Sequence, residues 1–423
     1  MGLYVRDMDD EMWAWVEAHM QADPLSLRLR YRGDERRLFA ILQIECRRKA
    51  ASKLRDTLSN SRFIFPTSLS AEQATSDILA RFHSTLFAPG ERVLDMTCGL
   101  GIDAFHIASK VGRIDSFEIT PEVAEAASHN AAVLGLSNFS VTCRDSVDGI
   151  RELADKSYDT VFIDPARRGE RGERRYALRD CSPDVVGLLT EIARVTDRLI
   201  VKASPMLDIT ETVRELPSAS DIYIIGTLTE CKELTLVADF SKNPEASSDD
   251  IGARPYPMIH AVTLMADGYS CEWSYRFGSD GVNRPEDKVV IEELEGKYLY
   301  EPFPSVMKAG GLRRLSSDYP QVRKLHRDTH LFVSDTLVEN FPGRCHEVLE
   351  ARAFASSEIR KIAGRRLKVN VTARNFPLTA PALVKKLHVT EGGTQRLFAA
   401  TLPAGPVLIL TRPVGDDDRN GKK

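Results

Sequence analysis

The 423-residue chain contains few cysteines and no long apolar run. Its seven cysteines form no Cys-x-x-Cys pair and stand at positions 46, 98, 143, 181, 231, 271 and 345. An odd, scattered set is not typical of a disulfide framework or a zinc site, so we expect reduced thiols and a cytoplasmic protein. The first residues lack the basic and apolar profile of a signal peptide, and no apolar stretch is as long as a membrane span. We therefore expect no membrane partner.

Histidine is also sparse, with nine residues in the chain. His326 and His330 stand four residues apart, and His346 follows further on. Neither a carboxylate nor a third ligand stands at metal-binding spacing from this pair. We expect no metal site.

The net charge of -4 conceals a strong segregation of charge along the chain. Residues 28–55 carry ten Lys and Arg against three acids, and residues 308–396 carry seventeen against eight. Clustered positive charge fits a polyanionic partner such as a nucleic acid, because local fields rather than total charge attract it. The alternative is that these residues form solvated helix faces.

The apolar pattern divides the chain into several regions. Residues 1–65 show helical spacing and predict an N-terminal helical lobe. Residues 66–245 alternate short apolar strands with amphipathic helices. A linker rich in Ser, Asn, Pro and Asp, residues 241–257, marks a domain boundary, and an α+β domain follows. The polar end of the chain, 413–423, is expected to be disordered.

Seven strands are predicted in the second region, at 92–96, 113–119, 139–145, 158–164, 197–203, 221–228 and 234–240. The first five alternate with helices, which requires a parallel sheet with right-handed crossovers. The last two are separated by too few residues for a crossover helix, so they must form an antiparallel hairpin. The predicted fold class is therefore α/β, with a Rossmann-like seven-stranded core that ends in a reversed hairpin. S-adenosylmethionine (SAM)-dependent methyltransferases have this arrangement, and ordinary dinucleotide-binding folds lack the hairpin.

The sequence VLDMTCGLG, residues 93–101, joins a strand to a helix through a glycine-bearing turn. Gly99 and Gly101 lack the Cβ atoms that would block a ligand over the strand end. Glu118 ends the second strand, where a carboxylate can accept both ribose hydroxyls of a nucleoside. NAD enzymes share this device and a lone glycine turn also suits a phosphate, whereas the reversed hairpin favours SAM.

The cofactor site predicted at this edge has a carboxylate for the ligand's amino group, a turn, a ribose-binding acid and adenine contacts. Its residues are Asp95, Thr97, Cys98, Gly99, Gly101, Glu118, Ile119, Asp145, Ser146 and Asp164. A nucleotide cofactor or an empty, degenerate site are the alternatives.

The sequence Asp164-Pro165-Ala-Arg167 follows the fourth strand. A carboxylate and a rigid proline at the sheet edge can orient an acceptor, and the motif resembles the (D/N/S)-P-P-(Y/F/W) of base methyltransferases. Arg167 replaces the aromatic residue that stacks on an exocyclic amine, which argues against that target. The structural alternative is that Asp164 only caps the next segment.

An arginine-rich loop continues from this motif. We expect its side chains to grip substrate phosphates by bidentate hydrogen bonds, through Arg167, Arg168, Arg171, Arg174 and Arg175. The alternative is a set of surface ion pairs with Glu170 and Glu173.

Lys202 ends the fifth strand and Glu233 begins the seventh. Because the seventh strand runs backwards, both residues are expected near Asp164. The set resembles the later members of the Lys-Asp-Lys-Glu tetrad of ribose 2'-O-methyltransferases, in which a lysine lowers the pKa of a hydroxyl. Gln73, or a residue near Lys53, takes the place of the first lysine. The alternative is an ordinary ion pair at the sheet edge.

Several segments together resemble a family of bacterial class I SAM-dependent methyltransferases. They are PTSLSAEQATSDILARF (66–82), DMTCGLG, FEITPE (117–122), DPARR, and the later segments YLYEPFPSVMKAG (298–310), LFVSDTLVENFPGRCHEV (331–348) and LKVNVTARNFPLTAPALVKKL (367–387). Members of this family carry a ferredoxin-like segment and a THUMP-like domain after the catalytic core. The core is also distantly similar to RNA cap guanine-N2 methyltransferases, whose S-P-P-W is DPAR here.

The resemblance implies a methyltransferase core at 66–245, a ferredoxin-like segment at 255–320 and a THUMP-like domain at 321–412. It also implies methyl transfer to RNA, with backbone contacts from Lys385, Lys386, Arg365, Arg366 and Arg374. We therefore expect a SAM-dependent enzyme that acts on tRNA or rRNA, with Asp164, Pro165, Lys202 and Glu233 as its catalytic residues. The alternatives are a small-molecule or protein methyltransferase, and a non-catalytic RNA-binding protein that keeps the fold as a scaffold.

Overall fold

The computed structural model describes residues 8–167, 177–241, 256–266, 268, 270–279 and 289–415. The chain forms two compact units. The first comprises Met1–Ile222, Glu233–Pro257 and Ala266–Gly268, and the second comprises Tyr223–Lys232, Met258–Met265 and Tyr269–Lys423. Of the expected tail at 413–423, residues 416–423 lie outside the described residues, whereas Pro413 is the last residue of a strand.

The first unit begins with a run of helices, of which those within residues 1–65 form the helical lobe that the sequence predicts. Four helices of this run are capped by side chains that accept backbone N–H bonds, which satisfies donors that the first turn leaves unpaired; the caps are Asp9, Asp23, Asp34 and Thr67. The elements are α1 (Asp10–His19), α2 (Pro24–Arg30), α3 (Glu35–Ala50), η2 (Thr57–Ser59), α4 (Ser68–Gln73) and α5 (Asp77–Ser84).

A nine-stranded sheet follows, in the order β11-β10-β8-β9-β7-β4-β1-β2-β3. All seven predicted strands occur in it, as β1 (Arg92–Asp95), β2 (Arg113–Glu118), β3 (Phe139–Cys143), β4 (Thr160–Ile163), β7 (Arg198–Ala203), β8 (Ala219–Gly226) and β9 (Cys231–Asp239). Two further strands of this sheet were not predicted from the sequence. They are β10 (Met258–Leu264) and β11 (Ser270–Arg276), which pair antiparallel beyond β8 and belong to the second unit.

The strand directions agree with the predicted topology. β1, β2, β3, β4 and β7 pair in parallel, whereas β9 runs antiparallel to β7. In that register Ala203 stands opposite Leu234, so Lys202 and Glu233 lie at the same edge of the sheet. The reversed strand β9 thereby places Glu233, near its start, beside the carboxyl ends of the parallel strands.

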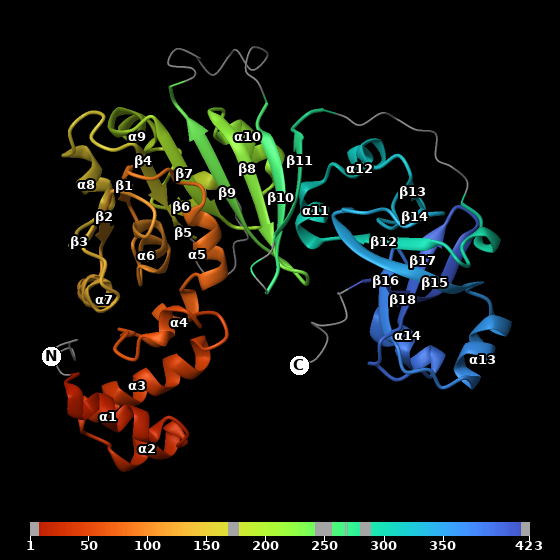
Figure 1. Ribbon diagram of the computed structural model, residues 1–423, viewed down its shortest axis with the longest axis horizontal. Helices are drawn as coiled ribbons and strands as arrows, with labels where there is room; N and C mark the ends of the chain where they lie inside the picture. Colours follow the sequence, from red (N-terminus) through yellow and green to blue (C-terminus); the bar gives the residue numbers. More distant parts are fainter. Residues whose placement is uncertain are drawn as a thin grey trace. The chain divides into compact units, whose positions relative to one another are not determined.

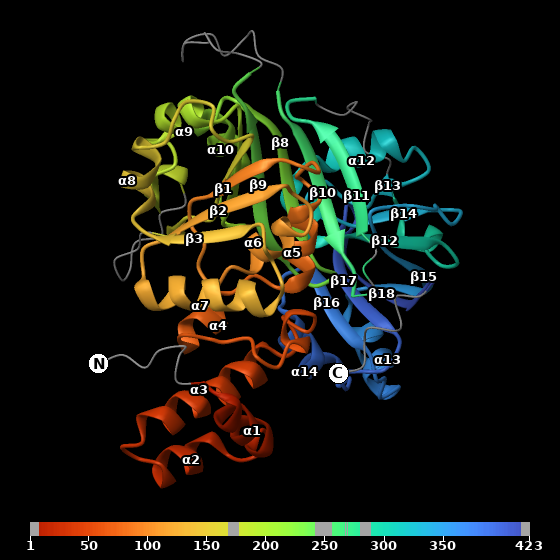
Figure 2. The same cartoon turned by 60° about the vertical axis from the view of Figure 1, so that its left-hand side comes forward.

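Helices cover both faces of this sheet. They are α6 (Ile102–Ala108), α7 (Pro121–Val133), α8 (Ser146–Arg151), α9 (Leu189–Val195) and α10 (Ile209–Glu215). Figures 1 and 2 show α5, α6 and α7 on one side of the strands and α8, α9 and α10 on the other. Two short strands, β5 (Ala166–Arg167) and β6 (Cys181–Ser182), pair separately near η3 (Leu178–Asp180).

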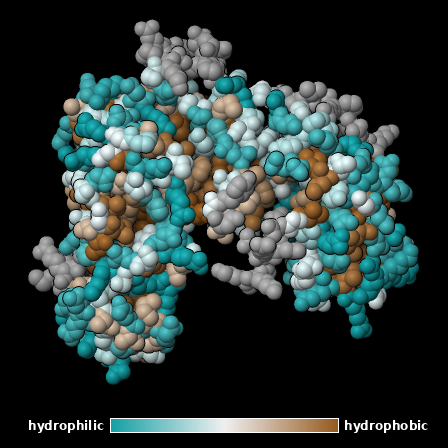
Figure 3. Space-filling view, viewed as in Figure 1, coloured by the Kyte–Doolittle hydropathy of each residue, from teal (hydrophilic) through white to brown (hydrophobic). Residues whose placement is uncertain are grey.

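Much of the positive charge of the N-terminal lobe is used within the lobe. Arg47 donates to the carbonyls of Ser61 and Phe63, and Arg48 donates to those of Met20 and Ala22. Ion pairs occupy further side chains, namely Arg28 with Glu45, Arg36 with Asp9, and Lys49 with Glu72. Figure 3 shows a largely hydrophilic face over these helices. Structural pairing therefore accounts for much of this basic run.

Two buried amides hold the chain at residues 64 and 65, one from α7 beside the sheet and one from α3 within the lobe. Asn130 of α7 accepts the Ile64 N–H at 2.8 Å and donates to the Ile64 carbonyl at 2.9 Å. Gln43 of α3 makes the same two-way contact with the backbone of Phe65, at 2.9 Å each way. Both amides are fully buried, so no water replaces these bonds if they are lost.

The second unit contains a seven-stranded sheet in the order β13-β14-β12-β15-β18-β17-β16. Helices accompany its strands. The elements are η4 (Ile291–Glu293), β12 (Tyr298–Pro302), α11 (Pro304–Ala309), α12 (Leu312–Asp318), β13 (Arg323–Lys324), β14 (Phe332–Ser334), β15 (Gly343–Ala353), α13 (Ser356–Gly364), β16 (Asn370–Arg374), α14 (Ala380–Leu387), β17 (Arg396–Leu402) and β18 (Gly405–Pro413). This is the predicted C-terminal α+β part. In the described part of the chain, no helix is long and apolar enough to cross a membrane.

We predict that Asn130→Ala lowers the free energy of unfolding by roughly 2 kcal/mol, because it leaves the buried N–H and carbonyl of Ile64 without partners. Urea denaturation measures the change. The control is Ser128→Ala on the exposed side of the same helix, which should change the stability little. Equal effects of the two substitutions would contradict the assigned role of Asn130.

Candidate functional site

The glycine turn lies between β1 and α6. Gly99 and Gly101 have φ angles of +54° and +89°, in the left-handed region that favours glycine. A Cβ on Gly101 would stand 2.4 Å from the Phe105 ring, so this position excludes every larger residue without rearrangement. A Cβ on Gly99 would meet nothing within 4 Å, so the turn is open above this residue.

Glu118, at the end of β2, is fixed against this turn. One of its carboxylate oxygens accepts the Gly99 N–H at 2.9 Å, and the other accepts the Thr120 N–H at 2.8 Å. Each oxygen keeps a lone pair, because a carboxylate oxygen can accept two hydrogen bonds. Next to it, Ile119 is 64% exposed and presents an apolar surface.

Asp95 lies beneath the turn. It is 1% exposed, and its carboxylate accepts the Thr97 N–H at 2.9 Å. Burial raises the pKa of Asp95 to about 7, because the charged form loses its hydration. The Thr97 hydroxyl accepts the Asp164 N–H at 2.7 Å. In this geometry Asp95 holds the turn, and the turn holds the segment after β4.

The remaining predicted cofactor residues have local roles. Asp145 caps α8 by accepting the Val147 N–H at 2.8 Å, and Ser146 is buried behind it. Cys98 is buried, and burial raises the pKa of its thiol well above the ordinary value. A thiol in that state is a poor nucleophile.

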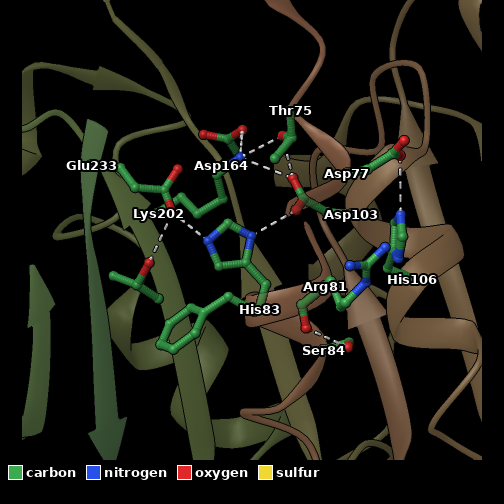
Figure 4. A network of polar contacts seen from close by, with 12 residues as sticks. Thr75, Asp77, Arg81, His83, Ser84, Asp103, His106, Asp164, Lys202 and Glu233 are labelled. Carbon is green, nitrogen blue, oxygen red and sulfur yellow. Dashed lines mark hydrogen bonds and ion pairs between the residues drawn. The ribbon is translucent and has the colours of Figure 1, made fainter. Parts of the chain in front are cut away.

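Asp164 and Lys202 form the centre of the site (Figure 4). The Lys202 ammonium lies 2.7 Å from Asp164, 2.9 Å from Asp103 and 2.8 Å from the Thr75 hydroxyl. The Lys202 side chain is 7% exposed, whereas that of Asp164 is 44% exposed. Pro165 is buried after Asp164. Asp164 is therefore held from within while part of its carboxylate faces outward.

A buried histidine that was not predicted from the sequence extends this network. His83 of α5 lies with one ring nitrogen 2.7 Å from Asp103 of α6 and the other against Glu233 of β9 (Figure 4). The His83 side chain has no exposed surface. The predicted neighbours Lys202 and Glu233 are thus linked through Asp103 and His83.

The charges of this network stabilise one another. Burial disfavours the charged form of His83, but the negative charges of Glu233 and Asp103 prevail and raise its pKa to about 9. Burial likewise opposes the charge on Lys202, yet Asp103, Asp164 and Glu233 hold its pKa well above the ordinary value. The pKa values of Asp103 and Glu233 are lowered, against the effect of burial, by these cations. Lys202 thus remains protonated, which makes it an electrostatic partner rather than a base.

The predicted substrate residues are spread over the chain. Gln73 is exposed at the end of α4. The backbone of Arg167 pairs with that of Cys181 in the small β5–β6 ladder, while Arg168, Arg171, Arg174 and Arg175 lie outside the described residues. Lys385 and Lys386 are exposed in the last turn of α14, in the second unit.

Three family models match the chain. A methyltransferase domain matches residues 87–220, a ferredoxin-like domain matches 298–342, and a THUMP-like domain matches 343–413. The match to the methyltransferase model includes the glycine turn, Glu118, Asp164 and Lys202.

Two known proteins are similar over nearly the whole chain. An uncharacterized SAM-dependent methyltransferase of Mycobacterium tuberculosis is 33% identical over 377 residues, covering 86% of this chain and 93% of that protein. A crystal structure assigned as a methyltransferase, from Porphyromonas gingivalis W83, is 26% identical with a TM-score of 0.83, covering 98% of this chain and all of the other. A shorter similarity, 40% identity over 81 residues, links 19% of this chain to 18% of the 23S rRNA (uracil(1939)-C(5))-methyltransferase of Shewanella amazonensis.

We predict that stability falls as the pH rises through the pKa of His83. The folded pKa is about 9 and the reference value is 6.5, so the folded chain binds this proton more tightly. The stabilisation that this proton contributes is complete below about pH 6.5 and lost above about pH 9. The free energy of unfolding therefore falls by an amount on the order of 3 kcal/mol. Urea denaturation across this interval measures it.

The variants for this experiment are His83→Gln and His129→Gln. His83→Gln should flatten the pH dependence, since it removes the titrating ring. His129 contacts the Arg62 carbonyl outside the network, and its substitution should leave the dependence as in the wild type. A wild-type stability that is constant from pH 6.5 to 9 would rule out the charged histidine.

Proposed function

We propose that this chain, which belongs to the SAM-dependent methyltransferase family, transfers a methyl group to RNA. The observation that carries the proposal is the half-exposed Asp164 carboxylate, held by Lys202 next to the glycine turn. The THUMP-like match and the local similarity to a 23S rRNA methyltransferase favour RNA as the acceptor. The scattered cysteines favour the cytoplasm as the place of action.

The residues at the turn fit the cofactor. Glu118 keeps two lone pairs that suit the ribose hydroxyls, and its position is fixed by two backbone N–H groups. The open turn at Gly99 leaves room for the ligand, and exposed Ile119 offers an apolar face to the adenine ring. When bound, SAM supplies an electrophilic methyl group.

Four residues would shape the turn from below, because they are buried or bonded within it; they are Asp95, Thr97, Cys98 and Gly101. Asp145 and Ser146 are the candidates for the adenine amino group, at the end of β3. A buried Asp95 reaches the ligand only through the turn or through a water molecule. Its proposed role is therefore to support the cofactor site.

Asp164 is the proposed acceptor-orienting group. Its carboxylate can accept a hydrogen bond from the N–H or O–H that becomes methylated, and it can then hold the proton that this atom releases. Lys202 contacts Asp164 directly and Glu233 acts through His83, so both are positioning residues. Pro165 fixes the backbone direction after Asp164, which keeps the carboxylate at the strand edge.

Glu118→Ala should weaken SAM binding by roughly 10- to 100-fold, because it removes the hydrogen bonds proposed for the ribose. Isothermal titration calorimetry with SAM measures the dissociation constant. The matched control is Glu122→Ala in the exposed first turn of α7, which should bind as the wild type does. Unchanged binding by Glu118→Ala would refute the cofactor assignment.

Asp164→Asn should lower the rate of methyl transfer by about 100-fold or more while it leaves SAM binding largely intact. The substrate is total RNA from a deletion strain, and incorporation of radiolabelled methyl groups measures the rate. Asp148→Asn, an exposed site on α8, is the control and should retain full activity. Mass spectrometry of the nucleosides identifies the modified base or ribose. If RNA from the deletion strain accepts no methyl groups and lacks no methylated nucleoside, the RNA proposal fails.

A further inference from the structure

The connection between α4 and α5, residues 74–76, contributes one side chain to the Lys202 network. The Thr75 hydroxyl donates to Asp103 at 2.6 Å and lies 2.8 Å from the Lys202 ammonium (Figure 4). A threonine hydroxyl has one proton to donate, and Asp103 accepts it. The bond between Thr75 and Lys202 can therefore have only one direction, from the ammonium to the hydroxyl oxygen.

This bond completes the set of partners of Lys202. An ammonium group has three donors, and those of Lys202 reach Thr75, Asp103 at 2.9 Å and Asp164 at 2.7 Å. The Lys202 side chain is 7% exposed, so water has little access to a donor that loses its partner. With all three donors engaged the ammonium has one orientation, and the Asp164 oxygen that it holds has one position.

The N-terminal helical lobe holds the same connection through Lys53. The Lys53 ammonium donates to the carbonyls of Glu72 and Ala74, at 2.8 Å each. The Lys53 carbonyl accepts the Asp77 N–H, also at 2.8 Å, at the first residue of α5. Lys53 thus bonds to the chain both before and after Thr75.

The Asp77 side chain adds a second link to the lobe. Its buried carboxylate accepts the N–H groups of Asp56 and Thr57, at 2.7 Å and 3.1 Å, and the Thr57 hydroxyl at 2.5 Å. The residues on either side of Thr75 are therefore fixed to the lobe. As a result, the Thr75 hydroxyl has little freedom to follow Lys202 if the network shifts.

The sequence predicts Gln73, or a residue near Lys53, in the place of the first lysine of a ribose methyltransferase tetrad. In the structure Gln73 is exposed at the end of α4, and Lys53 bonds to backbone carbonyls. The contact from this segment to the network comes from Thr75. The segment thus supplies a neutral hydroxyl that orients Lys202.

We propose that Thr75 is a positioning residue for methyl transfer, and that the helical lobe acts on the site through Lys53 and Thr75. Thr75 sets the orientation of the Lys202 ammonium, and Lys202 in turn holds the Asp164 carboxylate that meets the acceptor. The role in methyl transfer rests on the function proposed above, whereas the orientation of Lys202 does not. The lobe thereby contributes to the active site indirectly.

The first experiment observes the Lys202 ammonium by proton–nitrogen NMR of the full-length protein, without cofactor or RNA. Protons held in hydrogen bonds away from water exchange slowly, so the wild type should give a signal that is missing from Lys202→Arg. Thr75→Val should broaden or abolish this signal, because one donor loses its acceptor and the ammonium can rotate. Thr75→Ser should retain it, since serine keeps the hydroxyl. Thermal unfolding followed by circular dichroism shows which variants are folded.

The second experiment measures methyl transfer to RNA from the deletion strain at saturating SAM. Thr75→Val should lower the rate by roughly tenfold or more and change the dissociation constant for SAM by less than about twofold, because the hydroxyl acts on Asp164 rather than on the cofactor. Thr75→Ser should stay within about threefold of the wild-type rate. The matched control is Thr85→Val, at an exposed hydroxyl bonded to the Phe82 carbonyl, which should match the wild type in both experiments.

Lys53→Met tests the part of the lobe, and it keeps the inference falsifiable if Thr75→Val does not fold. It removes the bonds to two carbonyls beside Thr75, so it should broaden the Lys202 signal and lower the rate by roughly threefold. Lys49→Met is the matched control. Lys49 of α3 pairs with the exposed Glu72 carboxylate instead of a carbonyl, and its substitution should leave the signal and the rate unchanged.

The inference is overturned if the wild type gives no Lys202 signal, if folded Thr75→Val keeps the wild-type signal or rate, or if Thr75→Ser behaves as Thr75→Val does. The contribution of the lobe is overturned if Lys53→Met and Lys49→Met act alike. Wild-type protein that transfers no methyl group to RNA contradicts the proposed function instead, and the NMR signal then decides alone whether Thr75 orients Lys202. The two failures are therefore distinguishable.

Discussion

The site of the first unit depends on an ion pair network that is buried except at Asp164. His83 lies between Asp103 and Glu233, and Asp103 also contacts Lys202, which reaches Asp164. Charges buried in this way lose their hydration, so each is tolerated only while its partners remain in place. The network joins α5, α6, β7 and β9 at one point. As a result, the outward-facing Asp164 has a fixed position next to the glycine turn.

The sequence predicted the strands because their apolar residues are contiguous and bounded by polar turns. The positions of the glycine turn, Glu118 and Asp164 were predictable for a similar reason, since Glu118 ends a strand and the other two directly follow one. His83 and Asp103 were not, because each lies on a short helix where a single polar residue resembles an ordinary surface position. Only the folded chain brings them together. β10 and β11 were missed because they follow the linker, where the pattern indicated a separate domain.

Positive charge has different uses in different parts of the chain. In the N-terminal lobe, arginines such as Arg47 and Arg48 bond to backbone carbonyls and hold the helices together. In the second unit, Arg344, Arg374 and Arg396 instead surround a single carboxylate and stay partly exposed. Both regions looked alike in the sequence, because charge density does not reveal which partner an arginine finds. The contacts of the folded protein distinguish the two arrangements.

The central claim is that a charged His83 holds the site together from within. Nitrogen NMR of the His83 ring at pH 7 tests it most directly, because the shifts of the two ring nitrogens report their protonation. Protons on both nitrogens, with equal, imidazolium-like shifts, are the result that the buried carboxylates require. One protonated and one bare nitrogen would contradict the account, since Asp103 and Glu233 could not both then accept a hydrogen bond from the ring.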